Sequence, residues 1–169
     1  MKKYTVKFIT KNAIIAAVYF LLSVISFPIT FGLVQVRIAE LLVLLCFFNS
    51  DYILGITIGC FLTNLLSPLG FYDAAFGTLA TLLSCVLVSF MKHLLLGSLI
   101  PVIINGFVIG AEIFFIDGQG MHYFVIVGFV ALGEFIAVTL IGYAVFLLLK
   151  KNKHFFELID ARKNTDFKW

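Results

Sequence analysis

The stretch LVQVRIAELLVLLCFF, Leu33–Phe48, has the apolar character of a buried helix but carries three polar residues at its front edge. These residues are Gln35, Arg37 and Glu40. Arg37 and Glu40 are three positions apart, so on a helix they lie on one side and can form a local ion pair. Alternatively, the three polar residues belong to a larger polar site formed with other parts of the chain.

The composition is that of an integral membrane protein. Of the 169 residues, 62% are hydrophobic and 12% are charged, whereas soluble domains contain about 25% charged residues. The mean hydropathy is +1.13. A bilayer core about 30 Å thick requires about 20 helical residues for each crossing, so the chain is long enough for about six. We therefore expect an all-α bundle of six transmembrane helices.

Charged and turn-forming residues divide the chain into apolar stretches of suitable length. The second and third stretches are short, and the polar turn Asn49–Asp51 joins them, which indicates a helical hairpin. The other four are long enough for a full crossing. The stretches are about Lys11–Phe31, Gln35–Phe48, Tyr52–Leu66, Tyr72–Met91, His93–Ile116 and Met121–Leu149.

The basic residues predict the orientation of these spans. With an even number of crossings, every basic residue except Arg37 falls on one side of the membrane. The positive-inside rule makes that side cytoplasmic, so both termini are expected there. The residues concerned are Lys2, Lys3, Lys7, Lys11, Lys92, Lys150, Lys151, Lys153, Arg162, Lys163 and Lys168.

We divide the chain into a six-helix transmembrane domain, residues 1–149, and a cytoplasmic basic tail, residues 150–169. The tail contains four apolar residues that a short amphipathic helix would place together, which is typical of an anchor at the membrane surface. These are Phe155, Phe156, Leu158 and Ile159.

Several functional classes are not indicated. The three cysteines, Cys46, Cys60 and Cys85, lie in separate apolar runs without metal-ligand spacing, so we interpret them as packing residues. The sequence has no HExxH, GxSxG or P-loop motif. We therefore expect no enzyme, no metal ion and no cofactor. The topology accounts for the net charge of +3, so we expect no nucleic-acid partner either.

Polar residues within the spans predict a binding site in the outer half of the bundle. A carboxylate within a span costs about 2.5–3.5 kcal/mol, and such residues usually face the bundle interior or a wet cavity. Asn105 and Glu112 are seven positions apart, hence on nearly one helix face. The acids outnumber the available cation, Arg37, so a purely structural ion pair does not account for the group. The expected site residues are Gln35, Arg37, Glu40, Asn64, Asp73, Asn105, Glu112 and Glu134.

Small residues recur at intervals of four. The glycine pairs Gly55/Gly59 and Gly106/Gly110 predict close helix packing inside the bundle. Ala13 and Ala17, in the first span, have the same spacing. On spacing alone they also predict internal packing, with docking to a partner protein as the alternative.

Beginning at FGLVQVRIAELL, Phe31–Leu42, the chain resembles the QueT family. This family comprises substrate-binding S-components of energy-coupling factor transporters that serve queuosine precursors. Further similar stretches follow in order to the sixth span: GCFLTNLLSPLGFYDAAFGTLATLL at Gly59–Leu83, PVIINGFVIGAEIFF at Pro101–Phe115 and GEFIAVTLIGY at Gly133–Tyr143.

The resemblance implies a six-helix bacterial membrane protein that captures a 7-deazaguanine base from outside. It implies association with a transmembrane T-component and two cytosolic ATPase subunits, and docking through Ala13 and Ala17 of the first helix. Carboxylates would accept hydrogen bonds from the N–H groups of the base and balance the positive charge of an aminomethyl form. Amide side chains could donate hydrogen bonds to the base or accept them from it. Arg37 would hold Glu40 ionised or donate to the ligand carbonyl.

Two other functions remain open at this point. An S-component for a different vitamin would share the architecture, because specificity depends on side-chain contacts. A self-sufficient proton-coupled carrier could instead use Glu112 and Glu134 as relays. A carrier would transport its substrate alone in liposomes, whereas an S-component would need its energising partners.

Overall fold

The computed structural model describes residues 6–30, 34–117 and 120–161. Of the residues named in the sequence analysis, Lys2, Lys3, Phe31, Leu33, Arg162, Lys163 and Lys168 lie outside these ranges. The regular structure in the described ranges is helical. Its elements are α1 (Val6–Ile25), α2 (Phe27–Thr30), η1 (Ile38–Leu44), α3 (Leu45–Phe48), η2 (Ser50–Tyr52), α4 (Ile53–Asn64), α5 (Phe71–Phe90), α6 (Leu94–Glu112), η3 (Ile113–Asp117), α7 (Tyr123–Glu134), η4 (Phe135–Gly142), α8 (Tyr143–Leu149) and α9 (Lys153–Leu158).

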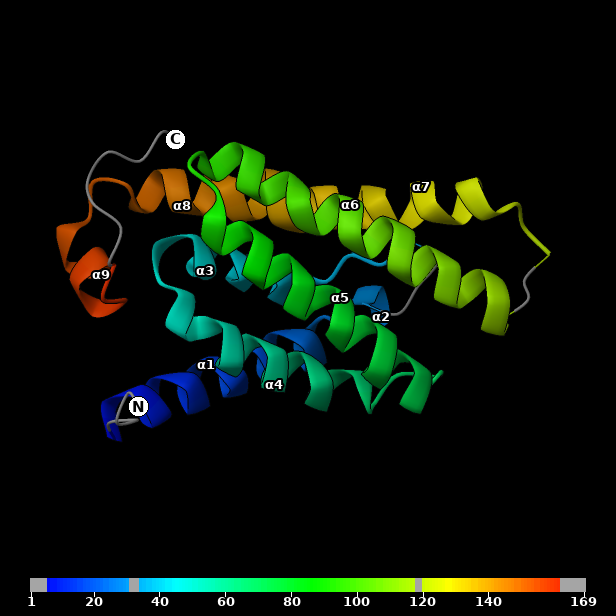
Figure 1. The fold of residues 1–169 in the computed structure, drawn as a ribbon, viewed down its shortest axis with the longest axis horizontal. Coiled ribbons are helices and arrows are strands. Elements are labelled where there is room, and N and C mark those ends of the chain that lie inside the picture. Colours follow the sequence, from blue (N-terminus) through cyan, green and yellow to red (C-terminus); the bar gives the residue numbers. More distant parts are fainter. Residues whose placement is uncertain (1–5, 31–33, 118–119, 162–169) are drawn as a thin grey trace.

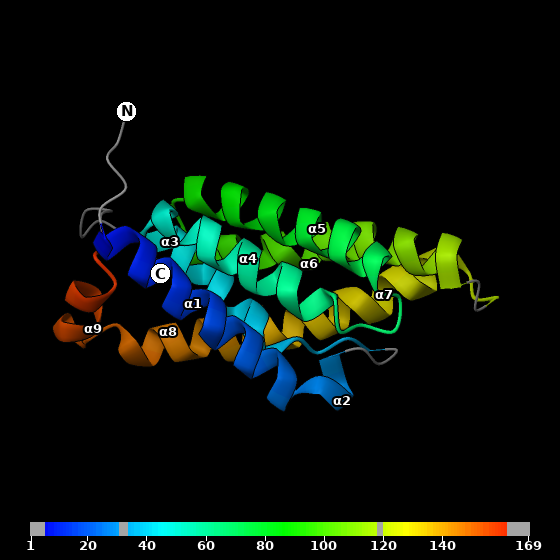
Figure 2. The ribbon, with the colours of Figure 1, turned by 90° about the horizontal axis from the view of Figure 1, so that it is seen from below.

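Within the described ranges, four helical stretches are long and apolar enough to cross a membrane: Val6–Ile25, Phe71–Phe90, Leu94–Ile116 and Tyr123–Leu149. The predicted second and third spans form shorter helices. Residues 35–37 are extended and a 3₁₀ helix begins only at Ile38, while α4 contains 12 residues. η1 and α3 are largely buried in the bundle, whereas α4 packs between α1 and α5 and exposes one face (Figures 1 and 2).

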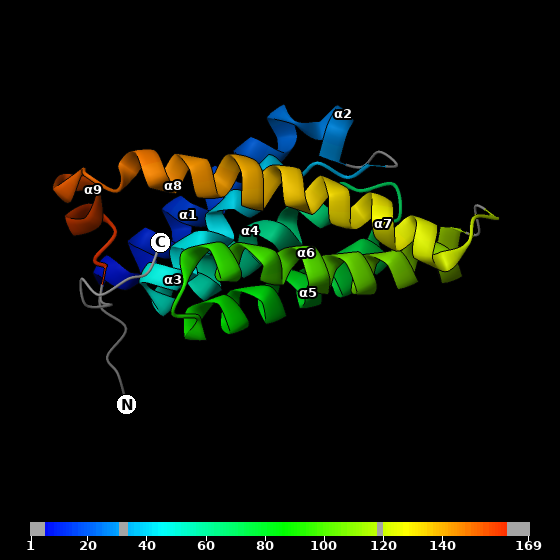
Figure 3. The ribbon, with the colours of Figure 1, turned by 90° about the horizontal axis from the view of Figure 1, so that it is seen from above.

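The helices run roughly antiparallel along the long axis of the molecule (Figure 1). The start of α1, the α5–α6 junction, the end of α8 and α9 lie together at one end (Figures 1 and 3). The basic residues of the described ranges, apart from Arg37, belong to these segments. In the described part of the chain, these basic residues therefore gather at one end of the bundle.

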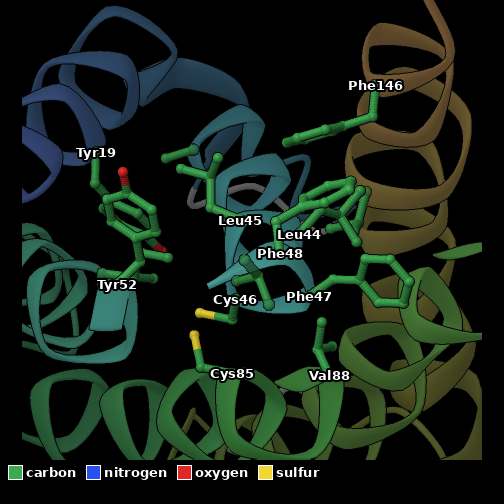
Figure 4. Packing of buried hydrophobic residues seen from close by; sticks show 14 of the residues in the cluster. Tyr19, Leu44, Leu45, Cys46, Phe47, Phe48, Tyr52, Cys85, Val88 and Phe146 are labelled. Carbon is green, nitrogen blue, oxygen red and sulfur yellow. The ribbon is translucent and has the colours of Figure 1, made fainter. Parts of the chain in front are cut away.

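The main apolar core lies around α3, with aromatic and aliphatic side chains from several elements (Figure 4). Phe48 stacks on Phe146 of α8, with ring centroids 5.4 Å apart. Cys46 of α3 and Cys85 of α5 point toward one another in this core (Figure 4) and have free thiols. Both cysteines are packing residues, as predicted.

Glycines allow the close helix contacts that their spacing predicts. A Cβ at Gly55 would lie 2.6 Å from the Asn12 carbonyl oxygen, and one at Gly59 would lie 2.9 Å from that of Ala16. Gly110 similarly faces Val127 of α7. The predicted internal packing of both glycine pairs is confirmed, because α4 lies against α1 and α6 against α7.

The C-terminal helix α9 packs against the bundle. Phe156 contacts Phe48, with ring centroids 5.4 Å apart, and Ile159 is buried, although Leu158 is exposed. Tyr52 donates a hydrogen bond of 3.2 Å to the Ile159 carbonyl. The sequence predicted that the apolar face of this helix meets the membrane surface. Most of that face instead covers the end of the core, where the ring of Phe48 lies.

Candidate functional site

One face of α5 supplies several polar groups of the site. Asp73, Gly77 and Thr81 occur at intervals of four residues, so they lie one after another along a single helix face. The side chains of Asp73 and Thr81 are buried. Gly70, with a φ of 55°, precedes the helix and permits the turn that places Asp73 in its first turn.

A hydrogen-bonded chain crosses the bundle from Arg37 to Tyr19. Arg37 Nη1 donates to Asn64 Oδ1 at 3.0 Å, and Asn64 Nδ2 donates to Cys60 Sγ at 3.3 Å. The Cys60 thiol is 3.2 Å from Thr81 Oγ1. Thr81 then donates to Glu40 Oε1 at 2.8 Å, and the Tyr19 hydroxyl donates to the same oxygen. The chain joins α1, η1, α4 and α5 through side chains.

Gly77 provides the space for this chain. A Cβ at this position would lie 2.6 Å from Asn64 Nδ2 and 3.6 Å from Arg37 Nη1. The first distance is shorter than real Cβ contacts, so a larger residue would displace the Asn64 amide. Glycine at position 77 thereby lets Asn64 hold Arg37.

A second glycine brings the extended segment before η1 onto α7. A Cβ at Gly133 would overlap the backbone of Gln35, so only glycine allows this approach. Gly133 immediately precedes Glu134. The contact therefore brings residues 35–37 to the part of α7 that carries a buried acid.

Glu112 and Glu134 have a common structural setting. Glu112 is the last residue of α6 and Glu134 is the last residue of α7, and each is followed directly by π-helical turns. π-helical turns inside α-helices often occur at functional sites. Because π-helical turns are wider than α-helical turns, α-helical periodicity does not predict which way the side chains after Glu112 and Glu134 point.

The acids of the site surround a single cation. Arg37 interacts electrostatically with Glu40, Asp73, Glu112 and Glu134. Asp73 also interacts with Glu112, and Glu134 with Asn105. Four carboxyl groups next to one guanidinium leave an acidic excess, and burying unbalanced charge is costly. Protons or a cationic ligand must therefore balance the site.

Several carboxylate oxygens have no hydrogen-bond partner among residues 6–30, 34–117 and 120–161. They are both oxygens of Glu112, Oδ1 of Asp73, and Oε2 of Glu40 and Glu134. The remaining oxygen of Asp73 accepts from Ser67. Buried polar groups are normally satisfied. These unsatisfied acceptors are available to a ligand with several donors.

The structure buries every predicted site residue, and none of them is more than 8% exposed. It places seven of them in one interacting group, and Gln35 joins through the contact of its backbone with Gly133. Glu40 accepts hydrogen bonds from Tyr19 and Thr81 and also interacts electrostatically with Arg37. Those seven are Arg37, Glu40, Asn64, Asp73, Asn105, Glu112 and Glu134.

Four further residues belong to the site but were not predicted from the sequence: Tyr19, Cys60, Thr81 and Ser67. The spacing of Thr81 from Asp73 and of Cys60 from Asn64 could have indicated two of them, since each pair shares a helix face. Tyr19 shares its helix face with the polar residues Asn12 and Ser23, but neither identifies Glu40 as its partner. Cys60 is both a packing residue and part of the hydrogen-bonded chain.

On α1, residues of the interior and of the surface alternate. Asn12, Ala16 and Tyr19 are buried against the bundle, whereas Ala13 and Ala17 are exposed. The two alanines thus lie away from the internal contacts of α1 with α4. They remain predicted docking residues.

The family model of the QueT transporter matches residues 9–151. The chain belongs to the QueT transporter family. The queuosine precursor transporter QueT of Lactococcus lactis subsp. cremoris (strain MG1363) is 39% identical over 84 residues, which cover 48% of this chain and 49% of that relative. The chain thus matches about half the length of the curated relative. No solved structure matches it.

The QueT match covers all eight predicted site residues and both alanines of α1. A transporter family and several long apolar helices together identify a multi-pass protein of a bacterial membrane. The family consists of transporters and not of enzymes, in agreement with the sequence analysis.

Proposed function

We propose that this QueT-family protein binds a queuosine precursor, a 7-deazaguanine base, as the substrate-binding S-component of an energy-coupling factor importer. The observation that carries the proposal is the set of buried carboxylate oxygens on η1, α5, α6 and α7 that lack a partner in the described part of the chain. The base offers ring and exocyclic N–H donors to these acceptors and a carbonyl to Arg37 or an amide. The relative's name supports the choice of substrate.

The topology proposed with this function has six crossings and cytoplasmic termini. Four helices are long enough to span alone, and the η1–α3 and α4 hairpin supplies two shorter crossings. The collection of basic residues at one end supports a cytoplasmic position for that end. The opposite end, with the carboxyl groups of Asp73 and Glu112, then faces outward.

The proposed energising partners are a T-component, which docks on the Ala13 and Ala17 face of α1, and two cytosolic ATPases. Small exposed side chains permit close approach of a partner helix. The protein itself would supply the ligand site, and ATP hydrolysis in the partners would drive delivery to the cytoplasm.

Titration calorimetry tests the ligand site. Replacing Glu112 or Glu134 by glutamine keeps the shape but removes the charge and one acceptor. A hydrogen bond to a charged group contributes about 1.5–3 kcal/mol, so affinity for the aminomethyl form of the 7-deazaguanine base should fall about 10- to 150-fold. Glu157→Gln, at an exposed position of α9, is the matched control and should bind normally. If both site variants bind normally but melt at lower temperature, the two acids are structural.

Uptake by purified components separates this function from a carrier. The protein alone in liposomes should bind the base without accumulating it, and adding the T-component, ATPases and ATP should start uptake. Accumulation by the protein alone, driven by a proton gradient, would instead establish a proton-coupled carrier that uses Glu112 and Glu134.

A further inference from the structure

The polar groups of the site divide into two parts along α6. Glu112 lies at its end and Asn105 lies seven residues earlier, which is about 10 Å along a helix axis. Glu112 is grouped with a second acid, Asp73, because α5 begins beside the end of α6 (Figure 1). Asn105 is grouped with Glu134 of α7. One part thus contains two acids, and the other an acid and an amide.

The two parts differ in what they can bind. Asp73 and Glu112 are each 3% exposed and have three unpartnered oxygens between them, counted against the described part of the chain. Two adjacent carboxylates repel each other unless a proton or cation lies between them. Glu134 beside Asn105 instead offers an acceptor next to an amide, which has both donor and acceptor groups. That combination suits the mixed edge of a guanine-like base.

We propose that Asp73 and Glu112 form an ammonium subsite which selects a 7-deazaguanine with a cationic aminomethyl arm, while Glu134 and Asn105 bind the base edge. This assignment rests on the proposed function. The ammonium group supplies three donors, one for each unpartnered oxygen of the acid pair. A bicyclic base with a one-carbon amine arm can bridge the two parts once the side chains reach toward it.

Other polar side chains near the pair are consistent with this division. Ser67 donates to Asp73 Oδ2 and Leu69 N–H donates to Ser67 Oγ at 3.0 Å, so the loop before α5 orients one acid. The oxygen that Ser67 leaves unused, Oδ1, is one of the three unpartnered acceptors. Arg37 donates to Asn64 and also interacts electrostatically with Asp73 and Glu112, so one guanidinium faces two carboxyl groups.

The test compares two probes that share the base: 7-aminomethyl-7-deazaguanine, which is cationic, and 7-methyl-7-deazaguanine, which lacks the amine. The unmodified protein should bind the aminomethyl probe at least about 10-fold more tightly, since a charged hydrogen-bonded group is gained. Equal affinity for the two probes overturns the ammonium subsite, and this comparison requires no variant to fold.

The variants then locate the subsite. Asp73→Asn and Glu112→Gln should each weaken the aminomethyl probe about 10- to 150-fold and change the methyl probe less than about threefold. Glu134→Gln should weaken both probes alike. If Asp73→Asn and Glu112→Gln affect both probes equally or not at all, or if Glu134→Gln is the selective variant, the assignment is wrong.

Failure of this inference is distinguishable from failure of the proposed function. If the unmodified protein binds neither probe, the queuosine-precursor function itself fails. If it binds both but the acid pair does not discriminate between them, the function stands and only the assignment of Asp73 and Glu112 falls. Melting temperatures of every variant show whether a loss of binding comes from unfolding.

Discussion

The Tyr19 hydroxyl donates a hydrogen bond to Glu40 Oε1, which links α1 directly to the polar interior of the bundle. Both side chains are almost fully buried. The same helix exposes Ala13 and Ala17 on its other side. α1 therefore carries both an inward group that supports the site and an outward face that is suited to a partner.

Removing this hydrogen bond should destabilise the protein. Tyr19→Phe leaves Glu40 Oε1 with Thr81 as its donor, so a hydrogen bond to a carboxyl group is lost in a buried place. The free energy of unfolding should fall by about 1.5–3 kcal/mol, measured by thermal or denaturant unfolding in detergent. Tyr72→Phe is the control, because Tyr72 is 51% exposed. Equal stability of the two variants would show that the Tyr19 hydrogen bond contributes little.

Adding one methyl group at Gly77 should impair ligand binding. In Gly77→Ala the new Cβ displaces the Asn64 amide and thereby loosens its hold on Arg37. Affinity for a 7-deazaguanine base should drop about 10-fold or more, because a charged hydrogen bond is disturbed. Gly128→Ala is the matched control: Gly128 is exposed on α7, and a Cβ added there would meet no atom within 4 Å. Unchanged affinity in Gly77→Ala would contradict a role for the Arg37–Asn64 contact.

Acidification should loosen the C-terminal helix. Hydrogen bonds from Lys11 and Lys7 lower the pKa of Asp160 below its ordinary value. Because this pKa is lowered, the ion pairs of Asp160 with Lys7 and Lys11 stabilise the folded protein fully above about pH 4, the value of a free aspartate. This stabilisation is lost as the pH falls through the folded pKa. The protection factors of the α9 amides against hydrogen exchange should therefore fall below about pH 4. Asp160→Asn should show the weaker protection of α9 already at neutral pH. If the variant exchanges like the unmodified protein, the ion pairs of Asp160 do not hold α9 against the bundle.

A bulky residue on the exposed face of α1 should prevent docking. Ala17→Trp should abolish uptake by the assembled transporter, because the indole holds a partner helix away, while ligand binding by the isolated protein stays nearly intact. Ala75→Trp, on the exposed face of α5, is the control and should preserve uptake. Loss of both binding and uptake in Ala17→Trp would indicate that the residue has an internal packing role.

The proposed topology predicts which sites are reachable from outside. A cysteine introduced at His122, which is exposed between η3 and α7, should react with a membrane-impermeant maleimide in intact cells. A cysteine at Lys151 should react only after permeabilisation. The native cysteines are buried, so the unmodified protein gives the background. The reverse pattern would place the termini outside.

Hydropathy and charge are local properties of the chain, so the sequence alone predicted the membrane class, the apolar segments and eight of the buried polar residues of the site. The packing of Gly55 and Gly59 on α1 was equally predictable, since close helix contact needs small residues at helical spacing. The partners of these residues depend on the fold: Glu40 bonds to Tyr19 and Thr81, Arg37 to Asn64, and Asp73 lies with Glu112. Such contacts depend on how each helix is rotated and on the π-helical turns after Glu112 and Glu134, which are set by packing between segments far apart in the chain.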